Sequence, residues 1–363
     1  MKILQLGKFY PVRGGVEKVM FDLTLGLSSR GITCDMLCAS LDKPSQIQLN
    51  PYGRVICTKA WFKAAGTMIS PGMIRWLRKH GKEYDLIHVH HPDPMAALAL
   101  WLSGYKGRVI LHWHSDIISQ KEFYILYQPL QRWLISRAEK IVGTTPVYVK
   151  ESPHLEGFRH KCTYVPIGIK PVIPDTQGAL KIREKVGGKL IVSIGRLVPY
   201  KGYGYLIEAM KYLPEDYHLI IGGTGPLRKN LEQKIQSLDL GDRVTLLGYV
   251  EDEMMPALFT ACDVFVLSSV MKTEAFGIVQ IEAMSCGKPV VATEIPGSGV
   301  PWVNDNGVSG VNVLPADPKA LARGIETAYK MKDTLGNGAK ALFRQRYTID
   351  GMIDNIIKVY ENN

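Results

Sequence analysis

The sequence predicts an α/β protein with two doubly wound, Rossmann-like domains, each a parallel sheet with helices on both faces. At 363 residues the chain is long enough for two domains of ordinary size. Strand-like apolar runs alternate with helical segments throughout, which is the pattern of parallel sheets covered by helices. The alternation occurs once in each half of the chain. Between the halves lies the segment Tyr164–Gly178, whose three prolines and two glycines suit an interdomain hinge.

The expected elements follow from short apolar runs and from the helical periodicity between them. The strands expected in the first half are Ile3–Leu6, Thr33–Ala39, Leu86–His90, Val109–His112, Lys140–Thr144 and Thr163–Val165. Those expected in the second half are Leu190–Ile194, His218–Gly222, Val244–Leu247, Val264–Leu267, Val290–Ala292 and Gly310–Val313. Helices are expected at Gly15–Arg30, Tyr203–Tyr212, Pro226–Leu238 and Pro318–Met331. We therefore predict one domain over residues 1–168 and another over residues 169–346, which face each other across a cleft.

Composition and cysteine usage indicate a globular protein of a reducing compartment. Hydrophobic residues make up 46% of the chain and charged residues 21%, which is ordinary globular usage. The longest apolar stretch, Met95–Ser103, is far shorter than the roughly 20 residues that a membrane span needs. The six cysteines include no C-x-x-C pair, so neither a disulfide framework nor a bound metal is expected. Because the first strand follows Met1-Lys2 without a signal peptide, the sequence predicts a cytoplasmic protein.

The excess of positive charge lies entirely in the first half of the chain. The net charge is +10, and residues 1–165 contain 22 Lys and Arg against 12 Asp and Glu. Residues 166–363 contain 22 of each sign. This asymmetry indicates an acidic partner such as nucleic acid, anionic lipid or phosphate, unless it is only an unselected basic surface. No helix-turn-helix, zinc or RNP pattern supports nucleic acid, so lipid phosphate is the better match.

The segment Gly72–Lys82 predicts a basic amphipathic helix. Four apolar residues share one face and four cations surround it: Met73, Ile74, Trp76 and Leu77, with Arg75, Arg78, Lys79 and Lys82. Such a helix binds anionic membranes, and Trp61-Phe62-Lys63 just before it adds to this interpretation. The alternative is a domain helix with an ordinary core face. We expect a peripheral protein on the inner face of the cell membrane.

The motif G-R-L-V-P-Y-K-G (Gly195–Gly202) predicts a phosphate site. It follows the expected strand Leu190–Ile194, so Arg196 and Lys201 would project from the carboxyl end of that strand. The planar fork of an arginine and the point charge of a lysine together suit diphosphate oxygens. The alternative is a pair of exposed loop cations. The G-G-T-G-P turn at Gly222–Pro226 is a weaker signal, because glycines there permit either ligand approach or a tight connection.

A second anion site is expected where E-A-F-G-I-V follows the strand Val264–Leu267. There a glycine precedes a helix whose first amides, those of Gly277, Ile278 and Val279, have no partner within the helix and suit phosphate. Glu282 lies about two turns into this helix and would accept hydrogen bonds from a ribose. Glu274, ahead of the helix, would contact a sugar.

These motifs together resemble glycosyltransferase family 4, the retaining, nucleotide-sugar-dependent enzymes of GT-B fold. The resemblance covers nearly the whole chain, and its most specific parts are E-A-F-G-I-V-Q-I-E-A-M, G-R-L-V-P-Y-K-G and P-V-R-G-G-V-E. It implies that Arg196 and Lys201 clamp the donor diphosphate. It also implies that Glu274 contacts the donor sugar and that Glu282 contacts the ribose hydroxyls. The anomeric configuration of the sugar would then be retained by a front-side reaction, in which the departing phosphate takes the acceptor proton.

The resemblance assigns the remaining site residues and the terminal helix. Backbone groups of Tyr249 and Val250 would meet the base, and a final amphipathic helix, residues 347–363, would return to the first domain. The donor-binding set is Gly14, Gly15, Arg196, Lys201, Val250, Glu274, Phe276, Gly277, Ile278, Val279 and Glu282, and the catalytic set is His114, Glu274, Arg196 and Lys201. No metal or other cofactor is expected.

Histidines crowd the first domain. The family has a functional histidine after a middle strand, and L-H-W-H-S-D-I supplies His112 and His114, which alternation points to the same side. His114 fits the family pattern better, and His112 better fits a core residue satisfied by hydrogen bonds, although position alone does not choose between them. His88, His90 and His91 cluster at a strand end, where a metal site is conceivable and a place in the cleft wall is the other interpretation. Because the resemblance implies no bound metal, we assign no metal ligand among them.

Donor and acceptor are the least defined features. The H-W-H-S-D-I block and the segment Pro296–Gly310 resemble those of bacterial surface-polysaccharide mannosyltransferases. The resemblance implies GDP-mannose as donor and a lipid-linked glycan as acceptor, with UDP-linked glucose, galactose or N-acetylhexosamine as alternatives. A basic membrane- or nucleic-acid-binding protein without transferase activity is the alternative of another class. An NAD-dependent oxidoreductase is disfavoured, because no G-x-G-x-x-G follows the first strand.

Overall fold

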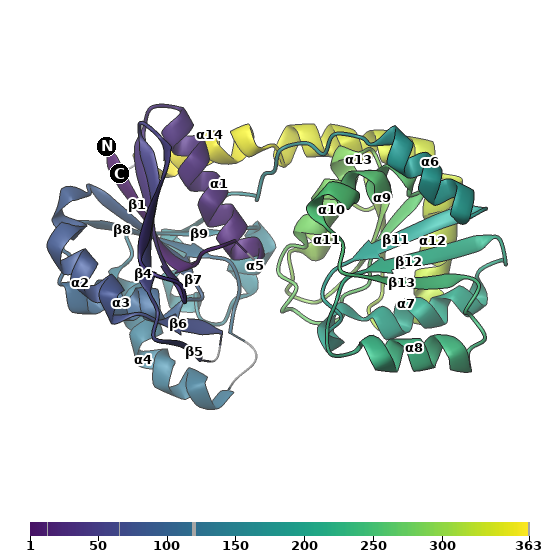
Figure 1. Cartoon of the computed structure of the whole chain (residues 1–363), viewed down its shortest axis with the longest axis horizontal. Helices are drawn as coiled ribbons and strands as arrows, with labels where there is room; N and C mark the ends of the chain where they lie inside the picture. Colours follow the sequence, from purple (N-terminus) through teal and green to yellow (C-terminus); the bar gives the residue numbers. More distant parts are fainter. Residues whose placement is uncertain (13, 65, 118–120, 362–363) are drawn as a thin grey trace. The chain divides into compact units, whose positions relative to one another are not determined.

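The computed structural model describes residues 1–12, 14–64, 66–117 and 121–361, without the side chains of residues 121–123. Arg13 of the P-V-R-G-G-V-E motif and residues 362–363 of the expected final helix lie outside the described residues. The chain divides into two compact units (Figure 1). Unit 1 comprises Met1–Ile167 and Ile349–Asn363, and unit 2 comprises Gly168–Thr348.

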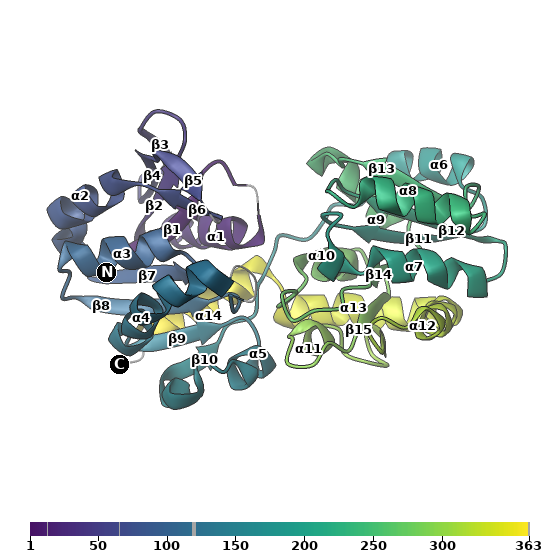
Figure 2. The same cartoon turned by 90° about the horizontal axis from the view of Figure 1, so that it is seen from below.

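The described residues of unit 1 form an eight-stranded sheet in the order β10-β9-β8-β7-β1-β2-β4-β3. Its strands are β1 (Lys2–Phe9), β2 (Thr33–Ser40), β3 (Ser45–Asn50), β4 (Gly53–Lys59), β7 (Leu86–His91), β8 (Arg108–Trp113), β9 (Lys140–Gly143) and β10 (Cys162–Tyr164). All neighbours are parallel except β3, which is antiparallel to β4. Figure 2 shows this sheet running from β3 and β4 at one edge to β10 at the other. Because β2 and β7 lie on opposite sides of β1, a topological switch point lies between β1 and β7, and the loop after β8 is next to the one after β7.

The helices of unit 1 cover both faces of this sheet. They are α1 (Gly15–Ser29), α2 (Pro71–His80), α3 (Pro94–Ser103), α4 (Lys121–Arg137), α5 (Pro146–Glu151) and α14 (Ile349–Glu361). Helix α1 packs against α14 on one face, and α2, α3 and α4 pack in series on the other (Figure 1). Asp93 fixes the start of α3, because its carboxylate accepts hydrogen bonds from the backbone N–H groups of Met95 and Ala96.

Four strands of unit 1 were not predicted: β3, β4 and the two-stranded hairpin of β5 (Phe62–Ala64) and β6 (Thr67–Ile69). Strand β3 reads S-Q-I-Q-L-N and is largely exposed, since it is the antiparallel edge of the sheet and its polar residues need no cover. The hairpin strands have three residues each, too few for a periodicity to show.

Helix α2 begins at Pro71, close to the predicted Gly72, and its apolar face is used inside unit 1. Met73 and Leu77 are buried, with 1% and 2% of their surfaces exposed. The Trp76 ring lies 6.1 Å from the ring of Tyr84. The interpretation of this helix as a membrane-binding element is therefore wrong in its main point, because a face packed in the core cannot also enter a bilayer. Its cations Arg75, Arg78 and Lys79 remain exposed.

The described residues of unit 2 form a six-stranded sheet in the order β13-β12-β11-β14-β15-β16, parallel throughout. The strands are β11 (Lys189–Ile194), β12 (Tyr217–Gly222), β13 (Val244–Gly248), β14 (Val264–Leu267), β15 (Val290–Thr293) and β16 (Gly310–Val313). The helices are α6 (Thr176–Lys185), α7 (Tyr203–Ala209), α8 (Arg228–Ser237), α9 (Met255–Ala261), α10 (Ile278–Ser285), α11 (Val300–Val303), α12 (Pro318–Lys330) and α13 (Lys332–Arg346). Helices α7, α8 and α12 cover one face, and α6, α9 and α10 cover the other (Figure 1). The switch point lies between β11 and β14, so the two motif loops that follow these strands begin side by side.

Helix α14 belongs to unit 1 although unit 2 precedes it in the chain. Ile353 packs where α1 has Gly26, since a Cβ on that glycine would lie 2.5 Å from the Ile353 Cδ1. Arg30 pairs with Asp350 and Asp354 at the end of α1. Tyr360 is buried, and its hydroxyl reaches the side chains of β1 and β7.

Candidate active site

The loop after β11 presents both predicted phosphate-binding cations. Arg196 is exposed, and Lys201 ends a short 3-10 turn, Pro199–Lys201. Gly202 closes this turn with φ +68°, and a Cβ there would lie 2.1 Å from the backbone oxygen of Ser268. Glycine is therefore required for the loops after β11 and β14 to approach each other.

Lys201 and Glu274 form an ion pair that the sequence did not predict. The Lys201 Nζ lies 2.5 Å from the Glu274 Oε2, and each side chain is only 11% exposed. The Ser269 hydroxyl donates a second hydrogen bond to the same carboxylate oxygen at 2.8 Å. The pair brings together a residue assigned to the diphosphate and one assigned to the sugar. A lysine ammonium has three donors, so its bond to Glu274 leaves two donors for a ligand.

Helix α10 begins where the sequence placed the second anion site. Its N-cap is Gly277 with φ +73°, and no side chain caps it. The first turn contains Ile278 and Val279, which are half-buried. Gln280 stabilises this turn, because its side-chain amide donates to the backbone oxygen of Phe276. A helix start without a capping side chain retains the positive end of its dipole for an anion.

Three other predicted donor residues differ in their surroundings. The Phe276 ring is buried and packs edge-on against Tyr347, with 6.0 Å between centroids. Only its backbone is therefore available to a ligand, and its side chain packs in the core. Glu282 is half-buried on α10. Val250, after β13, packs against β12, since a Cβ on Gly222 would lie 2.6 Å from the Val250 Cγ2.

The G-G-T-G-P turn has a structural explanation. A Cβ on Gly223 would lie 1.9 Å from the backbone oxygen of Gly195, and one on Gly225 would lie 2.4 Å from that of Leu197. The backbone N–H of Leu197 donates to Thr224 across the same contact. These glycines let the loop after β12 pack against the loop that carries Arg196, so they fix the position of that loop.

In unit 1 the predicted residues are Gly14, Gly15 and His114, which lie at the carboxyl ends of β1 and β8. Gly14 is the N-cap of α1, and both glycines are exposed. The buried Glu17 folds over the cap, because a Cβ on Gly14 would lie 2.4 Å from its Oε2. His114 follows β8, and its backbone N–H donates to His91 at the end of β7. The structure therefore brings these residues to one edge of the sheet.

The histidines of β7 and at the end of β8 are buried and do not form a surface wall. Four of the rings lie beside one another, those of His88, His90, His112 and His114, and the ring of His91 stacks on Trp113. His88, His90 and His91 are fully buried, which corrects the interpretation of these residues as a cleft wall. His112 is also buried, but neither of its ring nitrogens has a hydrogen-bond partner among the described residues. The expectation that hydrogen bonds satisfy His112 is thus wrong. Its ring is instead stacked on His114, with centroids 4.0 Å apart and planes inclined by 9°.

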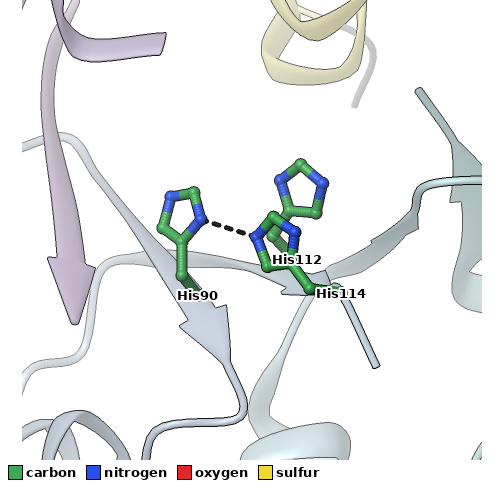
Figure 3. Close-up of side chains that lie close together, drawn as sticks. All are labelled: His90, His112 and His114. Carbon is green, nitrogen blue, oxygen red and sulfur yellow. Dashed lines mark hydrogen bonds between the residues drawn. The ribbon is translucent and has the colours of Figure 1, made fainter. Parts of the chain in front are cut away.

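Burial keeps these rings uncharged. It lowers the pKa values of His88, His90, His91 and His114 well below the ordinary 6.5, and that of His112 to about 3. His90, His112 and His114 lie close enough to suggest a metal site (Figure 3). However, the lone pairs of imidazole lie in the ring plane, and a single ion cannot lie in the planes of two stacked, nearly parallel rings. The arrangement fits a stack joined by a hydrogen bond better than a metal centre.

Comparison with known proteins identifies the family. One family model, described as glycosyl transferases group 1, matches residues 179–342, and another, described as Glycosyltransferase Family 4, matches residues 13–172. The chain is 31% identical to O-antigen chain mannosyltransferase C of Escherichia coli, over 99% of this chain and 98% of that protein. This chain belongs to glycosyltransferase family 4. It is also 30% identical to a D-rhamnosyltransferase of Pseudomonas aeruginosa, over 96% of this chain and 92% of that protein.

Solved structures show the fold of this family 4 glycosyltransferase. Sucrose-phosphate synthase from Thermosynechococcus elongatus has a TM-score of 0.82 at 22% identity, covering 99% of this chain and 98% of that one. WaaG, a glycosyltransferase of lipopolysaccharide biosynthesis, has a TM-score of 0.70 at 17% identity and covers both chains completely. The enzyme is thus a retaining hexosyltransferase of GT-B fold. None of its described helices is both long and apolar enough to cross a bilayer.

Proposed function

We propose that this glycosyltransferase moves mannose, with retention, from GDP-mannose to a lipid-linked glycan during synthesis of a bacterial surface polysaccharide of the O-antigen or capsule type. The observation that carries the proposal is the 31% identity, over 99% of the chain, to an O-antigen chain mannosyltransferase. The D-rhamnosyltransferase supports it, because D-rhamnose is 6-deoxymannose and so has the same ring configuration.

In this proposal unit 2 holds the donor. Arg196 and Lys201 bind the diphosphate and stabilise the charge that develops on it as the sugar leaves. The first amides of α10, from Gly277 to Val279, bind the same anion. Glu282 binds the ribose, and the backbone around Val250 meets the base. Glu274 orients the sugar hydroxyls, and its bond to Lys201 fixes the position of both side chains.

The chemistry needs positive charge and fixed geometry more than an enzymic base. The bond from the anomeric carbon to phosphate breaks as the bond to the acceptor oxygen forms on the same face, and the acceptor proton passes to the leaving phosphate oxygen. An enzymic carboxylate nucleophile, the usual route to retention, is then not required. We assign Gly14, Gly15 and His114 to the transferred sugar. The proposal includes no resident metal, since Arg196, Lys201 and the helix start supply the positive charge.

The donor is tested by binding and by turnover. Only a nucleotide that binds the folded state raises the melting temperature, so GDP should stabilise the enzyme while UDP and ADP should not. Release of nucleoside diphosphate is then compared for GDP-mannose, GDP-D-rhamnose, UDP-glucose, UDP-galactose and UDP-N-acetylglucosamine, with a polyprenyl-diphosphate glycan as acceptor. Stabilisation by UDP alone would overturn the mannose assignment, and an inverted anomer in the product would overturn the mechanism.

We also propose that unit 1 binds the anionic membrane surface that carries the acceptor. Trp61 and Phe62, after β4, are 69% and 53% exposed, far more than large apolar residues in a folded core. Beside them a cavity of about 310 Å³ is lined by Pro44, Thr58, Lys59, Trp61, Pro71, Gly72 and Arg75. Exposed aromatic rings next to cations suit the interface of an anionic bilayer.

Vesicle flotation tests the membrane proposal. The enzyme should float with vesicles that contain anionic lipid and should dissociate at high salt, because salt screens surface charge. The double change Trp61→Ser and Phe62→Ser should abolish flotation. Tyr164→Ser is the matched control, because Tyr164 is 45% exposed but lies on β10, at the opposite edge of the unit 1 sheet. Equal flotation of all three proteins, or none by the unmodified enzyme, would refute the proposal.

A further inference from the structure

Four buried histidines lie on one face of the paired strands β7 and β8. His90 is directly opposite His112 in the register of the pair, and alternation along each strand places His88 and His114 on the same face. The ring planes of these neighbours are inclined by 7–29°, and their centroids lie 4.0–5.3 Å apart. Because each ring is neutral, each carries one N–H group and one bare nitrogen. The positions of the protons on His88, His90 and His114 are then set by their hydrogen-bond partners, whereas His112 has none among the described residues.

A continuous chain of hydrogen bonds connects α14 to His114. The Tyr360 hydroxyl lies 2.6 Å from the His88 Nδ1. The Gln5 amide nitrogen lies 3.2 Å from the same hydroxyl, and the Gln5 Oε1 lies 2.8 Å from the His90 Nε2. The His90 Nδ1 lies 2.9 Å from the His114 Nε2, the contact drawn in Figure 3. Either direction of donation along such a chain would be self-consistent, so one bond must decide it.

The bond between Gln5 and Tyr360 decides the direction. The Gln5 Nε2 lies 3.2 Å from the Tyr360 hydroxyl and 3.7 Å from the Cys34 Sγ, so the Gln5 amide N–H groups donate on this side of the residue. The phenol therefore donates to the His88 Nδ1, and its oxygen accepts from the Gln5 amide. The carbonyl of Gln5 must then face His90 and accept from its Nε2–H group. The His90 Nδ1 is consequently bare.

We propose that Gln5 and His90 are positioning residues that hold His114 in the tautomer with its proton on Nε2. His114 donates that proton to the bare Nδ1 of His90, which leaves its own Nδ1 as a hydrogen-bond acceptor. An acceptor recognises a hydroxyl, which has a proton to give, and not a phosphate oxygen, which at neutral pH has none. The ligand group for His114 is thus a sugar hydroxyl. This last step rests on the proposed function, because that proposal assigns His114 to the transferred sugar.

Imidazole ¹⁵N NMR of the ligand-free enzyme tests the proposal directly, since protonated and bare ring nitrogens have distinct chemical shifts. The His114 signals are those that disappear in His114→Ala. We expect the Nε2–H tautomer in the unmodified enzyme. Gln5→Met removes the acceptor for His90, and Tyr360→Phe removes the hydroxyl that accepts from the Gln5 amide and so sets the direction. Both variants should therefore show a mixture of the two tautomers.

His112→Phe is the matched control, because His112 is equally buried and stacked on His114 but has no hydrogen bond in this chain. It should keep the Nε2–H tautomer. An Nδ1–H tautomer of His114 in the unmodified enzyme would overturn the proposal, and so would an unchanged tautomer in Gln5→Met and Tyr360→Phe. If a variant does not fold, the spectrum of the unmodified enzyme still decides the tautomer.

Turnover separates this inference from the proposed function. If the two tautomers become equally populated in Gln5→Met, the kcat/KM for the sugar donor should fall about twofold, since half the molecules present the wrong nitrogen. The spectrum of the ligand-free enzyme is independent of any transferase assay. If the tautomers are as expected but His114→Ala has the same turnover as the unmodified enzyme, His114 has no role in the reaction. The hydrogen-bond chain that positions it would still be supported.

Discussion

The ion pair of Lys201 and Glu274 allows a mutant cycle that separates catalysis from stability. At 2.5 Å their Coulomb attraction is about 6–7 kcal/mol for an effective dielectric constant of about 20, and desolvation offsets most of it. Lys201→Met keeps the aliphatic volume but leaves the Glu274 carboxylate without this cation. Removal of one partner from a buried pair costs about 3–5 kcal/mol, and we expect about 3 kcal/mol because both side chains still touch solvent.

The assay is thermal unfolding without ligand, followed by turnover. For a unit the size of Gly168–Thr348, a loss of about 3 kcal/mol lowers the melting temperature by about 6–12 °C. The double variant Lys201→Met with Glu274→Gln removes both charges and should recover most of that loss. Its kcat/KM should nevertheless remain about 10²–10³-fold below that of the unmodified enzyme, the scale expected when a transition-state charge contact is lost.

Lys234→Met is the control in the same unit. Its partner Glu208 lies 2.7 Å away, but the two side chains are 32% and 36% exposed, so the change should cost less than about 1 kcal/mol and leave turnover unchanged. If the double variant of Lys201 and Glu274 regained turnover together with its melting temperature, the pair would be purely structural. The assignment of both residues to the donor would then be refuted.

Four further outcomes are expected. Arg196→Ala should lower kcat about 10²–10³-fold without changing the melting temperature, because the side chain is exposed, and near-normal turnover would remove it from the phosphate site. Glu282→Ala should weaken GDP binding, measured by calorimetry, more than it lowers kcat, and the reverse pattern would exchange the sugar and ribose assignments. Gly202→Ala should lower the free energy of unfolding, measured in urea, by at least about 2 kcal/mol, because φ is +68° and the new Cβ meets the backbone of Ser268. Gly204→Ala is the control and should not lower it, because its Cβ meets no atom closer than 4.0 Å. Stability should fall as the pH drops from 7 to 5, because the unfolded chain binds protons below the ordinary pKa of 6.5 at five histidines whose folded pKa values burial lowers: His88, His90, His91, His112 and His114. A urea midpoint constant between pH 7 and 5 would contradict this.

The sequence predicted the parts of the site that depend on local structure. The expected strand Leu190–Ile194 and the loop after it lie where the pattern put them, because a run of apolar residues ended by glycine has few alternatives in an α/β chain. The start of α10 at Ile278 was equally local, since Gly277 marks it. Local signals of this type place side chains along the chain but do not say which of them meet.

What the sequence did not predict depends on contacts between distant residues. Lys201 and Glu274 are 73 positions apart, and only the adjacency of β11 and β14 joins them. The apolar stripe of α2 has the same periodicity whether it faces a bilayer or a core, and only the burial of Met73 and Leu77 in the folded unit decides between them. The same holds for His112, which looked like a satisfied core residue and is held by stacking.

The return of residues 349–361 to unit 1 has a consequence for biosynthesis. Unit 2 is a continuous segment and can complete its core as soon as Thr348 has left the ribosome. Unit 1 begins the chain, yet the cover over Gly26 and the phenol that orients Gln5 are supplied by Ile353 and Tyr360. The part made first is therefore the last to finish folding. Until then the sheet of unit 1 has all its strands but lacks the cover of α14, so apolar surface of the residues made first remains exposed to the translation machinery and its chaperones and is prone to aggregation.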